Sequence, residues 1–389
     1  MGKTSLNPAL IAIEEHAMTR IFQEILSTAQ NGEGKPPARQ LLEMAKLRLR
    51  KPPVGISEYF EYGIWHKSVT PAMADEFIGW RQSSLLDRHL NDDSSRVLAN
   101  DKLLNYLVLR AGGYPIPESI ASFTSSGRRI DRERVLTRLE DVYSFLEEDV
   151  YPFYVKPISA GYGHGVFGVS AREGDRFRLL DDSIVSREKL MAPFALPPYK
   201  GMLFQRPLTA HPEIVELTGT EAVSCIRFIC FITSDRPIIH TAFWKITTGR
   251  NMLDNFSHGD YGNCLGIADV ATGKITRVIA RMGPGGEITQ HPTTGKPLVG
   301  FQLPEWQKAK DLVCSASKEF PGLRLQNWDV SFCPEGPVLL ELNTESELAV
   351  PQAISGRGLM DPALRKILAD INAETDAYRA AIARQNEFR

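Results

Sequence analysis

Acidic and amide side chains accompany two apolar segments near the C-terminus. Asp329 lies within the apolar residues 325–333, and Glu341 and Asn343 end a second apolar run. The intervening Pro-Glu-Gly is typical of a tight turn, so we expect a β-hairpin. Because side chains alternate between the faces of a strand, a register that places Asp329 opposite Glu341 and Asn343 gathers three oxygen ligands. Such oxygens suit Mg²⁺, although a strand with an acidic polar face would give the same pattern.

A glycine-rich segment in the middle of the chain could bind phosphate. Lys156 lies near the end of the strand-like residues 153–158, and Gly161, Gly163 and Gly165 follow at every second position. Glycine tolerates positive φ, so successive backbone N–H groups can form an anion-binding nest, to which Lys156 adds a charge. A hairpin turn beside a surface lysine is the alternative. The segment lacks the Walker A pattern, and a strand follows its glycines where a Rossmann fingerprint needs a helix.

Length and composition are those of a globular protein with more than one domain. The chain has 389 residues, 43% of them hydrophobic, and a net charge of −2, which gives no reason to expect a nucleic-acid partner. We expect no membrane span, because no apolar run reaches about 18 residues, and no signal peptide, because the N-terminus lacks a basic stretch followed by an apolar one. The five cysteines form no C-x-x-C and no even-numbered disulfide set, so buried reduced thiols and a cytoplasmic setting fit best.

The spacing of apolar residues predicts a mixed chain without strict βαβ alternation, which indicates the α+β class. Asp131 is expected to cap one helix at its N-terminus. The expected helices are residues 8–29, 38–49, 71–90, 102–109, 131–147, 186–191, 305–320 and 361–383. The expected strands are residues 153–158, 166–170, 177–180, 202–205, 222–233 and 236–247, followed by the hairpin.

The two segments together resemble the ATP-grasp superfamily, which includes D-alanine–D-alanine ligase and glutathione synthetase, over about residues 100–352. The chain is most similar to the sugar-transfer-associated ATP-grasp group, which is related to α-L-glutamate ligases. The motifs that carry this resemblance are His211-Pro212-Glu213, Ser224-Cys225-Ile226-Arg227, Asp254-Asn255, His291-Pro292-Thr293-Thr294-Gly295, Trp328-Asp329, Glu341-x-Asn343 and Gln352. Arg206 departs from the superfamily pattern, because a Gln-Glu pair often occurs there.

The resemblance implies an ATP-grasp fold, with two α+β lobes that clamp the nucleotide, and an N-terminal helical region. Residues 1–95 would form that region, 96–205 the small lobe with its Gly-rich loop, 206–352 the large lobe with the magnesium site, and 353–389 a C-terminal helix. The region 1–95 could shape the acceptor site, form a homodimer or dock a partner.

The resemblance also assigns roles to single residues. Asp329, Glu341 and Asn343 would hold Mg²⁺, usually as a pair of ions, with Mn²⁺ as an alternative ion. Arg227 would stabilise the transferring phosphoryl group or an acyl-phosphate oxyanion, unless it forms an internal salt bridge with a core acid. The residues expected at ATP are Lys102, Lys156, Ser159, Gly161, Gly163, Gly165 and Gln205. Lys245 would do work similar to that of Arg227, and Asn255 would contact phosphate or substrate unless it is simply a turn residue.

The function that these assignments imply is an ADP-forming ligase that joins small-molecule carboxylate and amine substrates through an acyl phosphate. A kinase that phosphorylates a hydroxyl, and a non-catalytic nucleotide-binding protein in polysaccharide assembly, are the alternatives. His258 and His291 have no zinc-like spacing with cysteine, and a hydrogen bond that fixes its loop is an equal explanation for His291.

Overall fold

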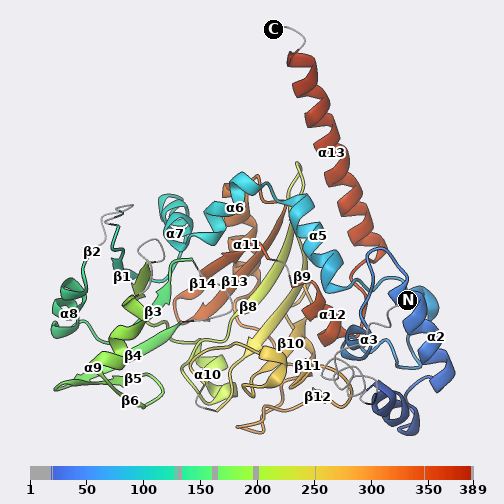
Figure 1. The fold of residues 1–389 in the computed structure, drawn as a ribbon, viewed down its shortest axis with the longest axis horizontal. Coiled ribbons are helices and arrows are strands. Elements are labelled where there is room, and N and C mark those ends of the chain that lie inside the picture. Colours follow the sequence, from blue (N-terminus) through green and yellow to red (C-terminus); the bar gives the residue numbers. More distant parts are fainter. Residues whose placement is uncertain are drawn as a thin grey trace, which may run out of the picture. The chain divides into compact units, whose positions relative to one another are not determined.

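The computed structural model describes residues 19, 21–126, 128, 134–159, 165–195, 201–249, 251–345 and 347–386 (Figure 1). Contacts within the chain separate it into two compact units. The first unit combines residues 1–85, 282–286 and 347–365, and the second combines residues 86–281, 287–346 and 366–389.

The described part of the first unit is helical, which confirms the expected N-terminal helical region. Residues 21–30 are helical, and the rest of the helix expected over residues 8–29 lies almost wholly outside the described residues. Aromatic side chains fill the core, where the rings of Tyr62 and Phe77 stack with their centroids 6.0 Å apart. The helices are α2 (Pro37–Arg48), α3 (Ile56–Glu61), α4 (Pro71–Ala74), the start of α5 (Trp80–Leu90) and α12 (Ala349–Ser355).

The single helix expected over residues 71–90 is wrong, because α4 ends at Ala74 and α5 begins at Trp80. The backbone between them bonds to a side chain. The Ile78 N–H donates to Gln352 Oε1 at 2.9 Å, and the Ile78 carbonyl accepts from Gln352 Nε2 at 2.8 Å. A helix would need those same groups for its own ladder. Gly79 also lies so close to the Pro53 carbonyl that an added Cβ would stand 2.6 Å from its oxygen.

The first sheet of the second unit has seven strands in the order β2-β1-β7-β3-β4-β5-β6. The expected glycine-rich hairpin is confirmed at its strands, because β3 and β4 pair antiparallel and Lys156 is the penultimate residue of β3. The strands are β1 (Ser119–Phe123), β2 (Arg134–Leu136), β3 (Phe153–Pro157), β4 (Phe167–Glu173), β5 (Arg176–Leu179), β6 (Ile184–Ser186) and β7 (Met202–Gln205). Apolar side chains of α8 (Leu139–Glu147) and α9 (Arg187–Met191) pack with these strands in one core.

The helix expected from Asp131 starts later than predicted. Asp131 lies outside the described residues, and residues 134–136 form β2, whose Val135 pairs with Ser122 of β1. The α8 helix therefore begins at Leu139. Its N-terminus is fixed by Asp141, whose carboxylate accepts from the Thr137 and Arg138 N–H groups at 2.9 Å each. A strand pairing decided the boundary here, and helical periodicity did not reveal it.

The second sheet of this unit has seven strands in the order β12-β11-β10-β9-β8-β13-β14, and all neighbours are antiparallel. The strands are β8 (Ile226–Ile232), β9 (Pro237–Ile246), β10 (Cys264–Ala268), β11 (Ile275–Ile279), β12 (Glu287–Ile288), β13 (Leu325–Cys333) and β14 (Gly336–Asn343). The expected hairpin is thus confirmed as β13 and β14. The expected strands 222–233 and 236–247 are confirmed with shorter bounds as β8 and β9.

Helices cover the apolar face of the second sheet. Buried side chains of Phe228, Trp244 and Trp328 pack in one core with residues of α7 (Lys102–Ala111), α10 (Pro212–Thr218) and α11 (Trp306–Ala316). The helix expected over residues 305–320 is α11 followed by the short helix Ser317–Glu319. The remaining helices are α6 (Asp93–Asn100) and α13 (Pro362–Asn386). In α13, every side chain from Asp376 to Ile382 is exposed.

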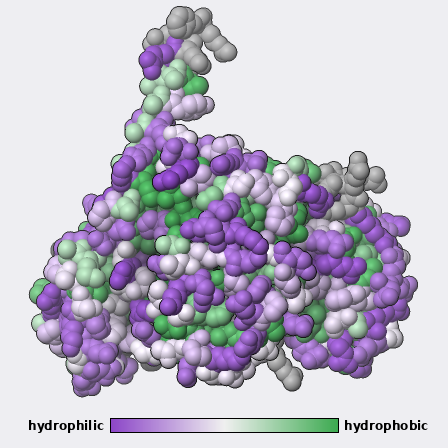
Figure 2. Space-filling view, turned by 180° about the vertical axis from the view of Figure 1, so that it is seen from behind, coloured by the Kyte–Doolittle hydropathy of each residue, from purple (hydrophilic) through white to green (hydrophobic). Residues whose placement is uncertain are grey.

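The face of the molecule in Figure 2 is mainly hydrophilic, with hydrophobic residues interspersed. Large exposed apolar side chains include Leu42, Leu49 and Trp80. In the part of the chain that the structure describes, no helix combines the length and the apolar character that crossing a membrane requires.

Candidate functional site

The polar face of the second sheet collects the residues that the sequence singled out near the C-terminus. Asp329 on β13 lies opposite Glu341 on β14 and opposite Arg227 on β8. Directly opposed residues in an antiparallel pair point to the same face, and Asn343, two residues after Glu341, shares it. The neighbours Trp328 and Leu342 point the other way into the core. The structure thus has the register that brings these residues together, and a β-bulge between Asp329 and Val330 produces it.

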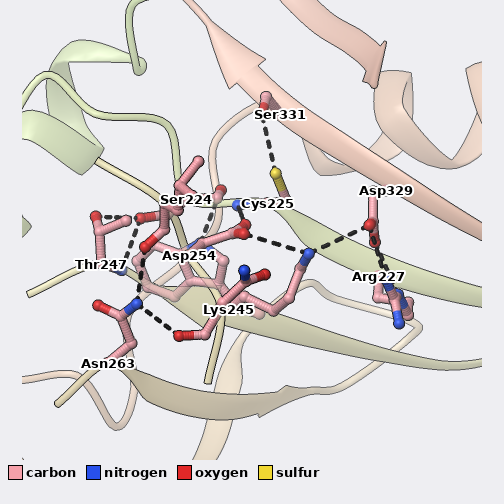
Figure 3. A network of polar contacts seen from close by, with 12 residues as sticks. Ser224, Cys225, Arg227, Lys245, Thr247, Asp254, Asn263, Asp329 and Ser331 are labelled. Carbon is pink, nitrogen blue, oxygen red and sulfur yellow. Dashed lines mark hydrogen bonds and ion pairs between the residues drawn. The ribbon is translucent and has the colours of Figure 1, made fainter. Parts of the chain in front are cut away.

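A buried ion-pair network surrounds Asp329 (Figure 3). Arg227 donates from Nε to Asp329 Oδ1 and from Nη2 to Oδ2, each at 2.8 Å, so it does form the internal salt bridge with an acid that was the alternative to a role at phosphate. Lys245 Nζ lies 3.2 Å from Oδ2, and Asn343 Nδ2 lies 3.4 Å from it. Burial acts to raise the pKa of Asp329, but Arg227 and Lys245 outweigh it and hold that pKa well below its usual range. Asp329 is therefore an ionised carboxylate at neutral pH.

Lys245 joins Asp329 to a third acid that the sequence analysis did not assign to the site. Its ammonium lies 3.4 Å from Asp254 Oδ1, and Asp254 Oδ2 accepts the Cys225 N–H at 2.9 Å. Burial acts to lower the pKa of Lys245, but Asp254 and Asp329 together raise it above its ordinary value. The Asp254-Asn255 motif indicated this part of the chain, but the sequence prediction named Asn255 and not Asp254.

Asn263 fixes the loop that carries Asp254 and Asn255. Its side chain is buried, with 1% of its surface exposed. Its Oδ1 accepts from the Thr248 N–H at 3.0 Å and from Asn251 Nδ2 at 2.8 Å. Its Nδ2 donates to the carbonyls of Leu253 and Asn255 at 2.8 Å each. The Asn263 amide thus bonds to both ends of the segment from Thr248 to Asn255 and to residues between them, which places Asp254 beside Lys245.

Helix α7 brings two further side chains to β14, the strand that carries Glu341. Asp101 caps the helix by accepting from the Leu103 and Leu104 N–H groups. In the first turn, Lys102 Nζ lies 2.8 Å from Glu341 Oε1. One turn later, the Tyr106 hydroxyl donates to the Leu340 carbonyl at 2.6 Å. Tyr106 was missed from the sequence, although its position four residues after Lys102 places both on one helix face.

Lys156 reaches the same tyrosine from the first sheet. Its Nζ donates to the Tyr106 hydroxyl at 2.7 Å. The residue is partly exposed along its length, but its ammonium is surrounded by protein. Burial lowers the pKa of Lys156 to about 8, and the Glu341 carboxylate only partly opposes that change. The two lysines expected at the nucleotide are thus linked, through Glu341 and Tyr106, to one segment of β14.

The remaining residues predicted to bind ATP are Gln205, Ser159 and the three glycines. Gln205 ends β7 and is buried, with Nε2 3.4 Å from Ser119 Oγ. Gly165 has φ +75°, as expected of a glycine-rich turn, and Ser159 follows β3 by two residues. Gly161 and Gly163 lie outside the described residues.

His291 forms hydrogen bonds that fix its loop, which is one of the two explanations that the sequence left open for this residue. Its Nε2 lies 2.9 Å from the Thr247 carbonyl oxygen, and its Nδ1 accepts from the Thr293 and Thr294 N–H groups at 3.3 Å each. His258 lies in the short helix Ser257–Gly259 with φ +58°.

The donor set fits a hard cation by its chemistry. The described residues contain no cluster of three or more His, Cys, Asp or Glu side chains arranged for a metal. The oxygens present are two carboxylates on opposed strand positions, Asp329 and Glu341, and the Asn343 amide. Mg²⁺ is usually held by one or two carboxylates together with a substrate phosphate, so this set suffices. Both carboxylates contact lysine or arginine here, so a cation would replace some of those contacts.

The comparison with known families decides the relationship. The family model described as sugar-transfer associated ATP-grasp matches residues 81–368. The chain belongs to this family. Its two sheets, preceded by helices, are therefore those of the ATP-grasp fold, which confirms the expected fold class. A comparison with curated protein sequences gives no match.

Solved structures similar to this ATP-grasp chain include several ligases. The ATP-grasp ligase PsnB, complexed with its minimal precursor, is 16% identical with a TM-score of 0.38, over 75% of this chain and 69% of PsnB. The VanG D-Ala:D-Ser ligase from Enterococcus faecalis is 13% identical with a TM-score of 0.40, over 72% of this chain and 64% of VanG. The D-alanine–D-alanine ligase from Coxiella burnetii is 13% identical with a TM-score of 0.39, over 79% of this chain and 70% of the ligase.

Proposed function

We propose that the chain is an ADP-forming carboxylate–amine ligase. The observation that carries the proposal is the set of four cationic side chains from separate elements around one carboxylate pair. Lys102 contacts Glu341. Arg227 and Lys245 contact Asp329. Lys156 donates to the hydroxyl of Tyr106, which itself bonds to the residue before Glu341. With Asp254 the set carries four positive and three negative charges. That excess of positive charge suits a polyanion such as the triphosphate of ATP.

The reaction needs activation because a carboxylate has no adequate leaving group. A carboxylate oxygen of the acid forms a bond to the γ-phosphorus as the bond from that phosphorus to the bridging oxygen breaks, and ADP leaves. The amine lone pair then forms a bond to the acyl carbon, the bond from carbon to the phosphate oxygen breaks, and phosphate leaves. The amine proton passes to solvent. The product is an amide.

The side chains contribute position and charge. Lys102 and Lys156 bind phosphate oxygens, and the glycine-rich segment expected from the sequence at Gly161, Gly163 and Gly165 would add backbone N–H donors. Arg227 is held by two hydrogen bonds to Asp329, so its guanidinium is preorganised to stabilise charge on the transferring phosphoryl group. Lys245 and Asn255 orient the acceptor side of the same site, and Gln205 meets the adenine. Exclusion of water protects the acyl phosphate from hydrolysis.

Mg²⁺ is the metal that the residues would hold, through oxygens of Asp329, Glu341 and Asn343, and Mn²⁺ would suit the same donors. When bound, the ion neutralises charge on the phosphates and aligns them. A solved complex of PsnB contains Mg and ADP, which supports this assignment for the present chain. The low pKa of Asp329 keeps its carboxylate in the ionised form that a metal requires.

The test is product formation with ATP, Mg²⁺ and pooled acids and amines, including amino-acid, peptide and sugar-linked carboxylates. We expect ADP and phosphate to appear only when an acid and an amine are both present. Asp329→Asn should abolish the release. Asp370→Asn is the control, because Asp370 pairs with Lys366 on the exposed surface of α13.

Two results would contradict the ligase scheme. Release of AMP and pyrophosphate would exclude an acyl-phosphate route. A stable phosphorylated product that forms without any amine would identify a kinase that phosphorylates a hydroxyl.

A further inference from the structure

Tyr106 connects the two sheets at the proposed nucleotide site. It lies on α7, its side chain is 2% exposed, and its hydroxyl contacts both Lys156 of β3 and the Leu340 carbonyl of β14. No assignment from the sequence gave this residue a role.

The directions of these hydrogen bonds follow from donor chemistry. A carbonyl oxygen can only accept, so the single phenolic proton of Tyr106 is committed to Leu340, 2.6 Å away. An ammonium can only donate, so Lys156 uses a lone pair of the same oxygen at 2.7 Å. The Leu340 carbonyl therefore fixes the hydroxyl, and the hydroxyl fixes the ammonium.

The acceptor matters because the Lys156 ammonium is surrounded by protein. Among the described residues, the Tyr106 hydroxyl is the acceptor that the structure gives it. An enclosed ammonium with few acceptors loses its proton more easily. The charged or titratable groups that influence Lys156 are Glu341 on β14, Cys225 before β8 and Tyr106 itself.

We propose that Tyr106 is the positioning residue for Lys156: it holds the ammonium beside the strand that carries Glu341 and keeps it protonated for phosphate recognition. The proposal rests on the proposed function, in which Lys156 binds phosphate. Lys102 stands one helical turn earlier at Glu341. Helix α7 would thus set the spacing of both lysines.

The test is ADP binding, measured by calorimetry with Mg²⁺ from pH 6.5 to 9, for the wild type and Tyr106→Phe. Loss of a hydrogen bond to a charged group should lower the pKa of Lys156 by about one unit. The dissociation constant of the variant should then be close to the wild-type value at pH 6.5, about fivefold weaker at pH 8 and nearly tenfold weaker at pH 9.

Two controls separate this effect from a general loss of structure. Tyr151→Phe removes a hydroxyl that also donates to a backbone carbonyl, that of Leu146 at 2.6 Å, and should leave the pH profile unchanged. In a Lys156→Met background, Tyr106→Phe should have no further effect on ADP affinity. An equal loss at every pH, or the same loss in the Lys156→Met background, would overturn the proposal.

A measurement without nucleotide keeps the two proposals distinguishable. The Lys156 resonance, assigned in ¹³C-lysine-labelled protein by its absence from Lys156→Met, should titrate near pH 8 in the wild type and lower in Tyr106→Phe. If the wild type binds no ADP but this shift occurs, the proposed function fails and the link between Tyr106 and Lys156 stands. A wild-type titration near the ordinary lysine value would overturn the link, even if Tyr106→Phe is too unstable to study.

Discussion

Replacing Asp329 by Asn tests the charge network most directly, because the change keeps the shape of the side chain and removes its charge. Arg227 would lose both ionic hydrogen bonds of 2.8 Å. Lys245 would lose its contact at 3.2 Å and keep Asp254 at 3.4 Å. The substitution therefore removes the carboxylate to which Arg227 donates two hydrogen bonds inside the sheet.

The expected cost follows from burial. The side chains of Arg227 and Lys245 are each 13% exposed and that of Asp329 is 6% exposed. Removing one partner of a buried pair costs about 3–5 kcal/mol, because the other charge stays buried. Since Lys245 keeps one partner, we expect about 3 kcal/mol. The control Asp370→Asn disrupts a pair whose side chains are 77% and 48% exposed, and should cost less than about 1 kcal/mol.

The assay is urea unfolding followed by peptide-resolved hydrogen exchange, because a chain with two compact units need not unfold in one step. Peptides from β8, β9 and β13 should lose protection at lower urea in Asp329→Asn than in Asp370→Asn. The double variant Arg227→Met/Asp329→Leu should recover most of the loss, because well-packed apolar side chains can replace a buried ion pair.

The pH dependence gives an independent check with a defined sign. The folded-state pKa of Asp329 lies below its unfolded value of about 3.9. Its contribution to stability is therefore present above about pH 4 and is lost as the pH falls towards the folded-state pKa. Asp329→Asn should flatten this acid limb. A cost equal to that of Asp370→Asn, together with an unchanged acid limb, would refute the described coupling of Asp329 to Arg227 and Lys245.

Two further predictions concern Lys156 and the loop that carries Asp254. Lys156→Met should weaken nucleotide binding yet stabilise the free protein by about 1–3 kcal/mol at pH 7, as judged by urea unfolding, because the buried ammonium has a lowered pKa. That advantage should shrink between pH 8 and about 10.5, where the wild-type lysine loses its proton and its penalty; an unchanged advantage at pH 10 would contradict the argument. Asn263→Ala should cost about 2–4 kcal/mol by removing the hydrogen bonds of a buried amide and should accelerate hydrogen exchange in residues 248–263, whereas unchanged exchange there would remove its role in fixing the loop.

Local patterns in the sequence were enough for several parts of this site. The two apolar runs around Asp329 and Glu341, with a turn between them, predict the hairpin. Its register at Asp329 depends on the β-bulge between Asp329 and Val330, which the sequence pattern does not reveal. The ordered motifs from His211 to Gln352 indicate the family. The role assignments for the site residues stay predictions.

Other features depend on contacts between distant residues and could not be predicted from local patterns. The break between α4 and α5 is made by Gln352, more than 270 residues later. The strand β2, which displaced the expected start of α8, exists because β1 offers it a pairing edge.

The sequence by itself determined which residues are cationic, acidic or apolar and, through its apolar runs and the turn between them, that β13 and β14 form a hairpin. Only the tertiary structure decided which charges meet. Arg227 and Asp329 are 102 residues apart and Lys156 and Tyr106 are 50 apart, and no local preference encodes such a pairing. The physical reason is that periodicity orients a side chain relative to its own strand or helix, whereas the partner is set by which strands pair and how the helices pack on them.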